Sequence, residues 1–225
     1  MNKRTLGVFI LLLAAGLSCA CNILGGGGDG GGEVVASPSP PAREILFQDD
    51  FSDSTSGWEV GDYETGGVGY KDGAYFVSAR SNGDTMWGVA NASFQDVVIE
   101  VDATQVAAGP DDNNDYGVVC REQGDGNGYY LLISGDGGYA ILKAQGGAFA
   151  PLVDWTSSDA VRQGNATNHI RAVCNGSTLE LYANGRRLAA VEDSTFARGD
   201  IALSATTYED VPTEIHFDDL VVYKP

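Results

Sequence analysis

Residues 43–225 are predicted to form an all-β sandwich of two antiparallel sheets, and three observations predict it. From Arg43 onward no apolar period of 3.6 residues persists beyond a turn or two, whereas alternating apolar and polar runs bounded by Gly, Asn and Asp recur throughout. We count at least eleven such runs in this segment. A single open sheet of that width would leave one apolar face in water, so the strands should stack in two layers.

The first expected strands are EILFQDDF and AYFVSA, followed by DVVIEVDATQV, which alternates cleanly. Its Val97, Ile99, Val101 and Ala103 should share the core face, while the residues between them face water. YGVVCRE, GYYLLIS and GYAILKA come next. The Asp-Gly steps in the connecting QGDGN and GDG predict tight hairpins, so the middle of the domain should be a meander.

The last expected strands are HIRAVC, STLELYA and RRLAAV, then DIALSAT and EIHFDDLVVY. Asn175-Gly176 and Asn184-Gly185 separate the first three. Asn-Gly pairs tolerate the positive φ that tight hairpins require, so these steps also predict turns between antiparallel neighbours.

Residues 1–20 have the anatomy of a signal peptide. Lys3 and Arg4 precede an apolar run from Leu6 to Leu17, which is too short to span a bilayer. The following LSCAC resembles a bacterial lipobox, which implies a diacylated cysteine at a new N-terminus. Cys21 is the predicted lipidation site and Cys19 the alternative, although neither has the preferred Leu three places upstream. Dual acylation would anchor the exported protein at the extracytoplasmic face of a bacterial membrane.

Residues 21–42 are predicted to be a tether between that anchor and the sandwich. The segment is rich in Gly in its first half and in Pro and Ser in its second, with almost nothing that could pack. A chain of this composition would span on the order of 25 Å. Its glycines therefore provide reach, because no strand precedes them and no helix follows, as a phosphate-binding loop would require.

The composition limits the possible partners. The sequence contains 13 basic and 31 acidic residues, a formal net charge of −18. Such a surplus repels nucleic acid and anionic lipid headgroups, so no nucleic-acid partner is expected and membrane contact should come through the lipid anchor only. Neutral ligands and cations remain possible.

Cys120 and Cys174 are the only cysteines of the predicted sandwich. Exported proteins meet oxidising surroundings, where an even pair usually forms a bridge, so we predict a disulfide. Two buried free thiols are the alternative.

Much of the sandwich resembles a known superfamily. DDFSDSTSGWEV, DGAYFV, YGVVCREQGDGNGYYLLISGDGGYAILK, HIRAVCNGSTLELYANGRRLAAV and IHFDDLVVY together resemble the concanavalin A-like lectin/glucanase superfamily, over nearly all of residues 46–223. The likeness is to laminin-G-like and 3-keto-disaccharide-hydrolase-type domains of bacterial envelope lipoproteins. It implies a jelly roll with a concave face left open for contact. The superfamily hosts lectins, hydrolases and adhesion modules, so fold alone does not select a function.

The resemblance also implies a structural calcium between the first and last strands. Asp49, Asp50, Asp218 and Asp219 are the expected ligands, because they stand at those positions and supply the oxygen atoms that calcium prefers. The alternative is that these side chains cap strand ends by accepting hydrogen bonds from turn amides.

A sugar site needs flat apolar rings with a few convergent polar groups. The candidates in or beside the central strands are Trp87, Tyr116, Arg121, Tyr130 and Trp155. Arg121 should point away from the core if Cys120 points into it. Aromatic residues of a sandwich are mostly core, so only one or two should face the ligand.

Catalysis has weaker support in the sequence. Glucanases of the superfamily carry a strand motif with three carboxylates, whereas Glu100-Val-Asp102 continues to Gln105, which cannot act as a general acid. We therefore predict a surface-anchored lipoprotein whose sandwich binds carbohydrate or another extracellular polymer. The alternatives are a structural or adhesion module without a small-molecule site, and a hydrolase of glycosidic bonds.

Overall fold

The computed structural model describes residues 43–225, which form fifteen β-strands and no helix. The strands are β1 Ile45–Asp49, β2 Gly61–Tyr63, β3 Gly66–Lys71, β4 Ala74–Ala79, β5 Thr85–Phe94, β6 Val97–Ala107, β7 Asn114–Glu122, β8 Gly128–Ser134, β9 Gly138–Gln145, β10 Ala148–Ser157, β11 Thr167–Asn175, β12 Thr178–Ala183, β13 Arg186–Glu192, β14 Gly199–Thr207 and β15 Thr213–Tyr223. No helix among these residues could therefore cross a membrane. The predicted signal peptide, Cys21 and tether lie outside the described residues.

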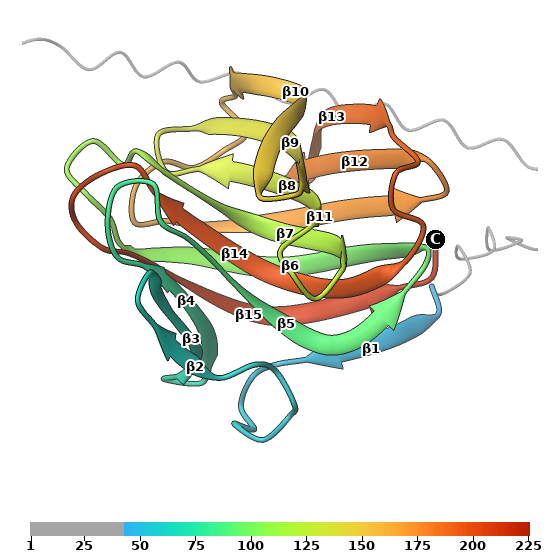
Figure 1. Ribbon diagram of the computed structural model, residues 1–225, viewed down its shortest axis with the longest axis horizontal. Coiled ribbons are helices and arrows are strands. Elements are labelled where there is room, and N and C mark those ends of the chain that lie inside the picture. The colour runs from blue at the N-terminus through green and yellow to red at the C-terminus, as the bar shows by residue number, and fades with distance from the viewer. Residues whose placement is uncertain (1–42) are drawn as a thin grey trace, which may run out of the picture. The chain divides into compact units, whose positions relative to one another are not determined.

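The strands form two stacked antiparallel sheets, as predicted (Figure 1). The nine-stranded sheet has the order β13-β12-β11-β6-β15-β4-β3-β2, with β1 also paired to β15. The six-stranded sheet has the order β10-β9-β8-β7-β14-β5. Its edges are thus β10 on one side and β5 on the other.

The inner faces of the two sheets enclose the core. Val97, Ile99, Val101 and Ala103 all point into it, so the alternation predicted for β6 is confirmed. Large side chains such as Tyr75 fill the space between the layers. Complete burial of one such side chain contributes about 1.5–3 kcal/mol, which makes this shared apolar layer the main source of stability.

A disulfide between Cys120 of β7 and Cys174 of β11 joins the two sheets through the core. Their Cα atoms are 6.8 Å apart. The predicted bridge is confirmed. Because both sheets, the core and the disulfide lie within residues 43–225, this segment contains all the parts of one independent folding unit.

Four strands were not expected from the sequence: β2, β3, β5 and β10. Strands β5 and β10 both deviate from regular pairing. The register of β5 against β14 shifts between Asp200 and Ala202, and β10 shifts twice against β9. Bulges of this kind interrupt the two-residue alternation by which strands are identified in a sequence.

Candidate functional site

The outer face of the six-stranded sheet is apolar. Side chains opposite the core form a second hydrophobic cluster, made of Val119, Tyr130, Leu132, Ala140, Leu142, Ala144 and Ala202, with Trp87 and Val89 packed against it. Its middle is closed by the protein itself, since Tyr130 is 1% exposed and Phe149 packs edge-on against it at 5.0 Å between ring centroids. The middle of this face is therefore not open for contact, in contrast to the open face that the resemblance implies.

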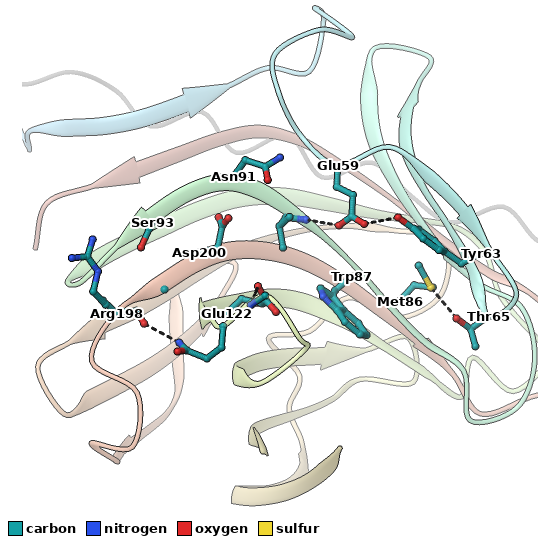
Figure 2. Close-up of a pocket in the computed structure, with 14 residues that line it drawn as sticks. Glu59, Tyr63, Thr65, Met86, Trp87, Asn91, Ser93, Glu122, Arg198 and Asp200 are labelled. Carbon is teal, nitrogen blue, oxygen red and sulfur yellow. Dashed lines mark hydrogen bonds between the residues drawn. The ribbon is translucent and has the colours of Figure 1, made fainter. Parts of the chain in front are cut away.

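A cavity of about 810 Å³ remains open at the β5 edge of this face (Figure 2). It is bordered by β5, the end of β7, the start of β14 and the segment around β2. The side chains that matter for its chemistry are Glu59, Tyr63, Trp87, Asn91, Ser93, Glu122, Arg198 and Asp200. One indole and one phenol thus border a space that is also lined by several polar side chains.

Trp87 and the loop after β7 form one wall. Glu122 accepts a hydrogen bond from the backbone N–H of Gly124 and another from that of Gly126, both at 2.7 Å, so its carboxylate fixes the loop. Gly126 has a φ of +82° and lies so close to the indole that a Cβ there would be 2.8 Å from Cζ2 of Trp87. Glycine is therefore required at this position, both by the backbone conformation and by the contact with the ring.

The opposite wall is shaped by the bulge in β5. Asn91 has a positive φ of 57°, and its side-chain amide donates to the carbonyl of Gly57 at 2.7 Å. This contact holds the segment that leads to Glu59. Asp200 of β14 accepts hydrogen bonds from the N–H groups of Ala92 and Ile201 through one carboxylate oxygen. The bulge is therefore pinned on both sides.

Carboxylates outnumber cations in the cavity. Glu59, Glu122 and Asp200 line it together with Arg198 alone. Burial raises the pKa of Asp200, although the hydrogen bonds from Ala92 and Ile201 partly oppose that rise and the charge of Glu122 adds to it. Asp200 and Glu122 lie directly opposite each other on paired strands.

Two of the five predicted ligand-contacting residues have exposed surface. Trp87 borders the cavity, as Figure 2 shows. Trp155 is 44% exposed on β10, at the other edge of the sheet, outside this cavity. Two other predicted residues are buried aromatic rings. Tyr116 points into the main core, where burial raises its pKa to about 12, and Tyr130 lies under Phe149.

The prediction for Arg121 is also wrong, because β7 carries a bulge at this residue. Arg121 has a positive φ of 56°, and the pairing with β14 shifts between Asp200 and Ile201. Arg121 is the extra residue of this bulge, so its side chain does not turn to the opposite side of the strand from Cys120. Its guanidinium is 2% exposed and donates to the carbonyls of Gln95 and Phe196. Arg121 therefore joins β7 to neighbouring loops and does not reach the outer face.

Three of the four aspartates predicted to bind calcium accept hydrogen bonds from neighbouring turn residues. Asp49 accepts from the N–H of Phe51 and the hydroxyl of Ser56, and Asp218 accepts from the N–H of Asp219. Asp50 accepts from both the N–H and the hydroxyl of Ser52. Among residues 43–225 no group of three or more His, Cys, Asp or Glu side chains is arranged to hold a metal ion. These hydrogen bonds fit the turn-capping alternative. Calcium binding at the four aspartates stays a prediction.

Glu100 and Asp102 lie on the outer face of the other sheet. Glu100 pairs with Arg43 at 2.8 Å, and Asp102 contacts Nδ1 of His169 at 2.7 Å. Glu100 is thus a partner in a surface ion pair and Asp102 is hydrogen-bonded to an imidazole, and neither residue lines the cavity beside Trp87. The polar residues that do line the cavity had no sequence signal, because they come from bulges and loops at distant positions in the chain.

Comparisons with known proteins support the fold. No family model matches the chain, and no curated protein matches its sequence. A solved carbohydrate-binding module from Bacillus subtilis is 17% identical, with a TM-score of 0.57, and the match covers 75% of this chain and 96% of the module. A Bacillus subtilis protein of unknown function with a galectin-like fold is 12% identical, with a TM-score of 0.58 and coverages of 80% and 96%.

A β-glucanase from Bacillus licheniformis is similar in fold as well. It is 10% identical with a TM-score of 0.58, and the match covers 80% of this chain and 97% of the glucanase. Similarity at such low identity shows a shared fold. The predicted two-sheet jelly roll of the concanavalin A-like type is thereby confirmed.

Proposed function

We propose that the cavity beside Trp87 binds a neutral carbohydrate, as part of an extracellular polymer, without cleaving it. The observation that carries the proposal is the indole of Trp87 at the edge of a cavity of about 810 Å³, among polar side chains that are held in place. Sugar rings present flat apolar faces and a rim of hydroxyl groups, which suits one aromatic surface with a few fixed donors and acceptors. The structural neighbours include a protein described as a carbohydrate-binding module.

Charge favours a neutral ligand over an anionic one. Three carboxylates and one guanidinium line the cavity, and the whole chain carries a net charge of −18. Sulfated or uronic-acid sugars would therefore be repelled, and the repulsion would weaken in high salt. Carboxylates accept hydrogen bonds from sugar hydroxyls, so the same residues favour neutral sugars.

Hydrolysis of a glycosidic bond is the second candidate, favoured by the adjacent Asp200 and Glu122. Paired carboxylates are the catalytic groups of most glycosidases. However, both oxygens of Glu122 accept loop N–H groups, and the residue is only 3% exposed. A carboxylate committed in this way is not free to attack a sugar or to transfer a proton, so binding is the better supported function.

Binding is tested with the soluble segment 43–225 on an array of neutral and anionic glycans, followed by calorimetry. We expect retention by at least one neutral polysaccharide and a loss of at least tenfold in affinity for Trp87→Ala, since buried aromatic contacts dominate binding energies. Val106→Ala removes an exposed apolar side chain of β6 in the other sheet and should bind normally. Thermal melts would verify that both variants fold.

The outcomes separate the candidates. Retention by no neutral glycan would overturn the proposal, as would equal affinity of wild type and Trp87→Ala. Release of reducing ends from the bound glycan, lost in Asp200→Asn, would favour the hydrolase.

We further propose that the chain is a lipoprotein displayed at the extracytoplasmic face of a bacterial membrane, with Cys21 acylated. The support is the charged and apolar leader, the LSCAC segment and the Gly- and Pro-rich residues that follow. Mass spectrometry of membrane fractions should find a diacylated N-terminal Cys21. An unmodified Cys21 behind an uncleaved leader would contradict it.

A further inference from the structure

We propose a second carbohydrate-binding site, centred on Trp155, at the opposite edge of the six-stranded sheet. The ligand class rests on the proposed function of the Trp87 cavity, but the site itself rests on separate residues. It is a cavity of about 410 Å³ bordered by the start of β7, the end of β8, the start of β9 and the end of β10. No residue lines both cavities.

A bulge directs Trp155 into this position. Val153 pairs with Ile141 and Thr156 with Tyr139, so Asp154 and Trp155 together occupy the step opposite one residue of β9. Bulges re-aim side chains and are frequent beside binding sites. In a regular strand the two-residue alternation alone would fix the direction of the Trp155 side chain. The extra residue shifts that alternation, so the exposed position of the indole depends on the bulge.

Glycine leaves room beside the ring. A Cβ added to Gly138 would lie 3.4 Å from Cε3 of Trp155 and 2.7 Å from the hydroxyl oxygen of Ser134. A larger residue at this position would therefore collide with Ser134 and reduce the space next to the indole. The absence of a side chain at position 138 is part of what keeps the cavity open.

The polar groups of this cavity are already held in place. The hydroxyl of Ser134 donates to Asp136 and accepts the N–H of Gly138 at 2.7 Å. Tyr208 donates its hydroxyl to the buried Asp115 at 2.7 Å. Side chains fixed before the ligand arrives lose less conformational entropy on binding, which favours recognition of a flexible polymer.

The two sites are separate subsites, not two parts of one groove. Strands β5 and β10 are the two edges of the sheet, with four strands between them, which on a flat sheet corresponds to roughly 24 Å. Tyr130 and Leu132 are buried in the middle of this face. A polysaccharide could therefore contact both ends while passing over the closed centre, and the linked contacts would add avidity.

Tryptophan fluorescence distinguishes the two sites, because the chain has three tryptophans and Trp58 is only 4% exposed. In Trp87→Phe, Trp155 is the remaining accessible indole. A neutral oligosaccharide that binds at this second site should shift or quench its emission. In Trp155→Phe, the same sugar should change only the emission of Trp87.

Calorimetry gives the stoichiometry. We expect two sites for a short oligosaccharide in the wild type and one in each of Trp87→Ala and Trp155→Ala. For the long polymer, each single variant should lose tenfold or more in apparent affinity through lost avidity. Val106→Ala, an exposed apolar residue of β6 in the other sheet, is the matched control and should behave as the wild type.

Each failure has its own signature. If Trp155→Ala binds oligosaccharide and polymer as the wild type does, the second site is overturned and the proposed function stands. If only Trp155→Ala loses binding, the assignment of the first site to Trp87 is overturned. A wild type that binds no glycan overturns both.

Discussion

The outer faces of the two sheets differ in kind, although both are built from the same alternating strands. On the nine-stranded sheet, outward side chains form ion pairs, as between Lys71 of β3 and Glu214 of β15 and between Arg43, which precedes β1, and Glu100 of β6. Arg43 also stacks over the ring of Tyr223, with 4.0 Å to the centroid. This face has the character of a solvated surface, because its charged side chains pair with one another, as Arg171 also does with Glu100 at 3.5 Å.

The outer face of the six-stranded sheet shows the opposite pattern. Trp87, Val119, Tyr130 and Leu132 cluster there, and in the described part of the chain no ion pair joins side chains across it. It also contains Asp115, whose Oδ1 is buried without a hydrogen-bond partner. An apolar face with buried, incompletely paired polar groups is costly for a merely solvated surface. The difference supports the proposal that the sugar-binding face lies on the six-stranded sheet.

The largest expected effect on stability comes from removing the disulfide that joins the two sheets, whose outer faces differ. The disulfide closes a loop with a sequence separation of 54 residues. Replacing both Cys120 and Cys174 by Ala should lower the free energy of unfolding by up to about 4 kcal/mol in the chain-entropy account. Urea unfolding followed by circular dichroism measures this loss. A change below about 1 kcal/mol would mean that the unfolded chain gains little freedom when the bridge is removed.

Asp115→Asn tests the buried acid of the six-stranded face. Burial raises the pKa of Asp115 from 3.8 to about 6, against the opposing hydrogen bond from Tyr208. The folded state thus holds this proton more tightly than the unfolded state does, so the contribution to stability is complete below about pH 4 and is lost as pH rises through 6. At pH 7 the free energy of unfolding of the variant should exceed that of the wild type by up to about 3 kcal/mol. Near pH 4 the two free energies should be nearly equal.

Urea unfolding of the wild type and of Asp115→Asn at pH 4 and pH 7 measures the difference in their free energies of unfolding. Because the two chains share every other titrating group, the general effect of net charge cancels. A variant less stable than the wild type at pH 7 would show that the carboxylate is the favoured form, contrary to the burial argument.

Lys143→Met tests the edge where the two sheets meet, which belongs to neither outer face. Lys143 of β9 contacts Asp193 at 2.7 Å and Thr195 at 2.9 Å, and Tyr129 donates to Asp193 at 2.6 Å. Burial alone would raise the pKa of Asp193, but the hydrogen bonds that this carboxylate accepts from Lys143, Thr195 and Tyr129 outweigh burial and lower the pKa. The resulting stabilisation is present above the ordinary pKa of 3.8 and lost as pH falls.

The expected cost of Lys143→Met is about 1–2 kcal/mol at pH 7, discounted because both side chains keep some solvent exposure. We expect the difference in free energy of unfolding between the wild type and Lys143→Met to narrow from pH 7 to pH 2, as Asp193 becomes protonated. A gap that does not depend on pH would assign the cost to lost packing of the lysine stem.

The sequence predicted the solvated face and the core far better than it predicted the proposed binding face. Strand β6 has regular alternation, so the core positions of Val97 and Ile99 could be read directly. The pairing of Cys120 with Cys174 followed from the expectation of export and from an even count of cysteines. These inferences succeed because regular alternation and a single pair of cysteines leave few alternatives.

The proposed binding face depends on irregularities of the strands that alternation cannot reveal. The bulge at Arg121 turned this side chain inward, and bulges in β5 and β10 set the surroundings of Trp87 and Trp155. Both of these strands were missed in the sequence although their tryptophans were singled out. Residue type alone therefore indicated the rings, while their directions depended on tertiary contacts.

Glu100→Gln is the matched counterpart of Asp115→Asn, and its expected effect is the smallest. Glu100 interacts with Arg43 at 2.8 Å and Arg171 at 3.5 Å, but both guanidinium groups are substantially exposed. Water and salt screen such pairs, so the loss should stay within about 1 kcal/mol and shrink further at high ionic strength. Glycan affinity should not change, because the residue lies on the opposite sheet. Unfolding at low and high salt, together with calorimetry on the bound glycan, measures both. A loss of several kcal/mol, or of sugar binding, would remove the distinction between the two faces, since an acid of the solvated face would then matter as much as the buried one.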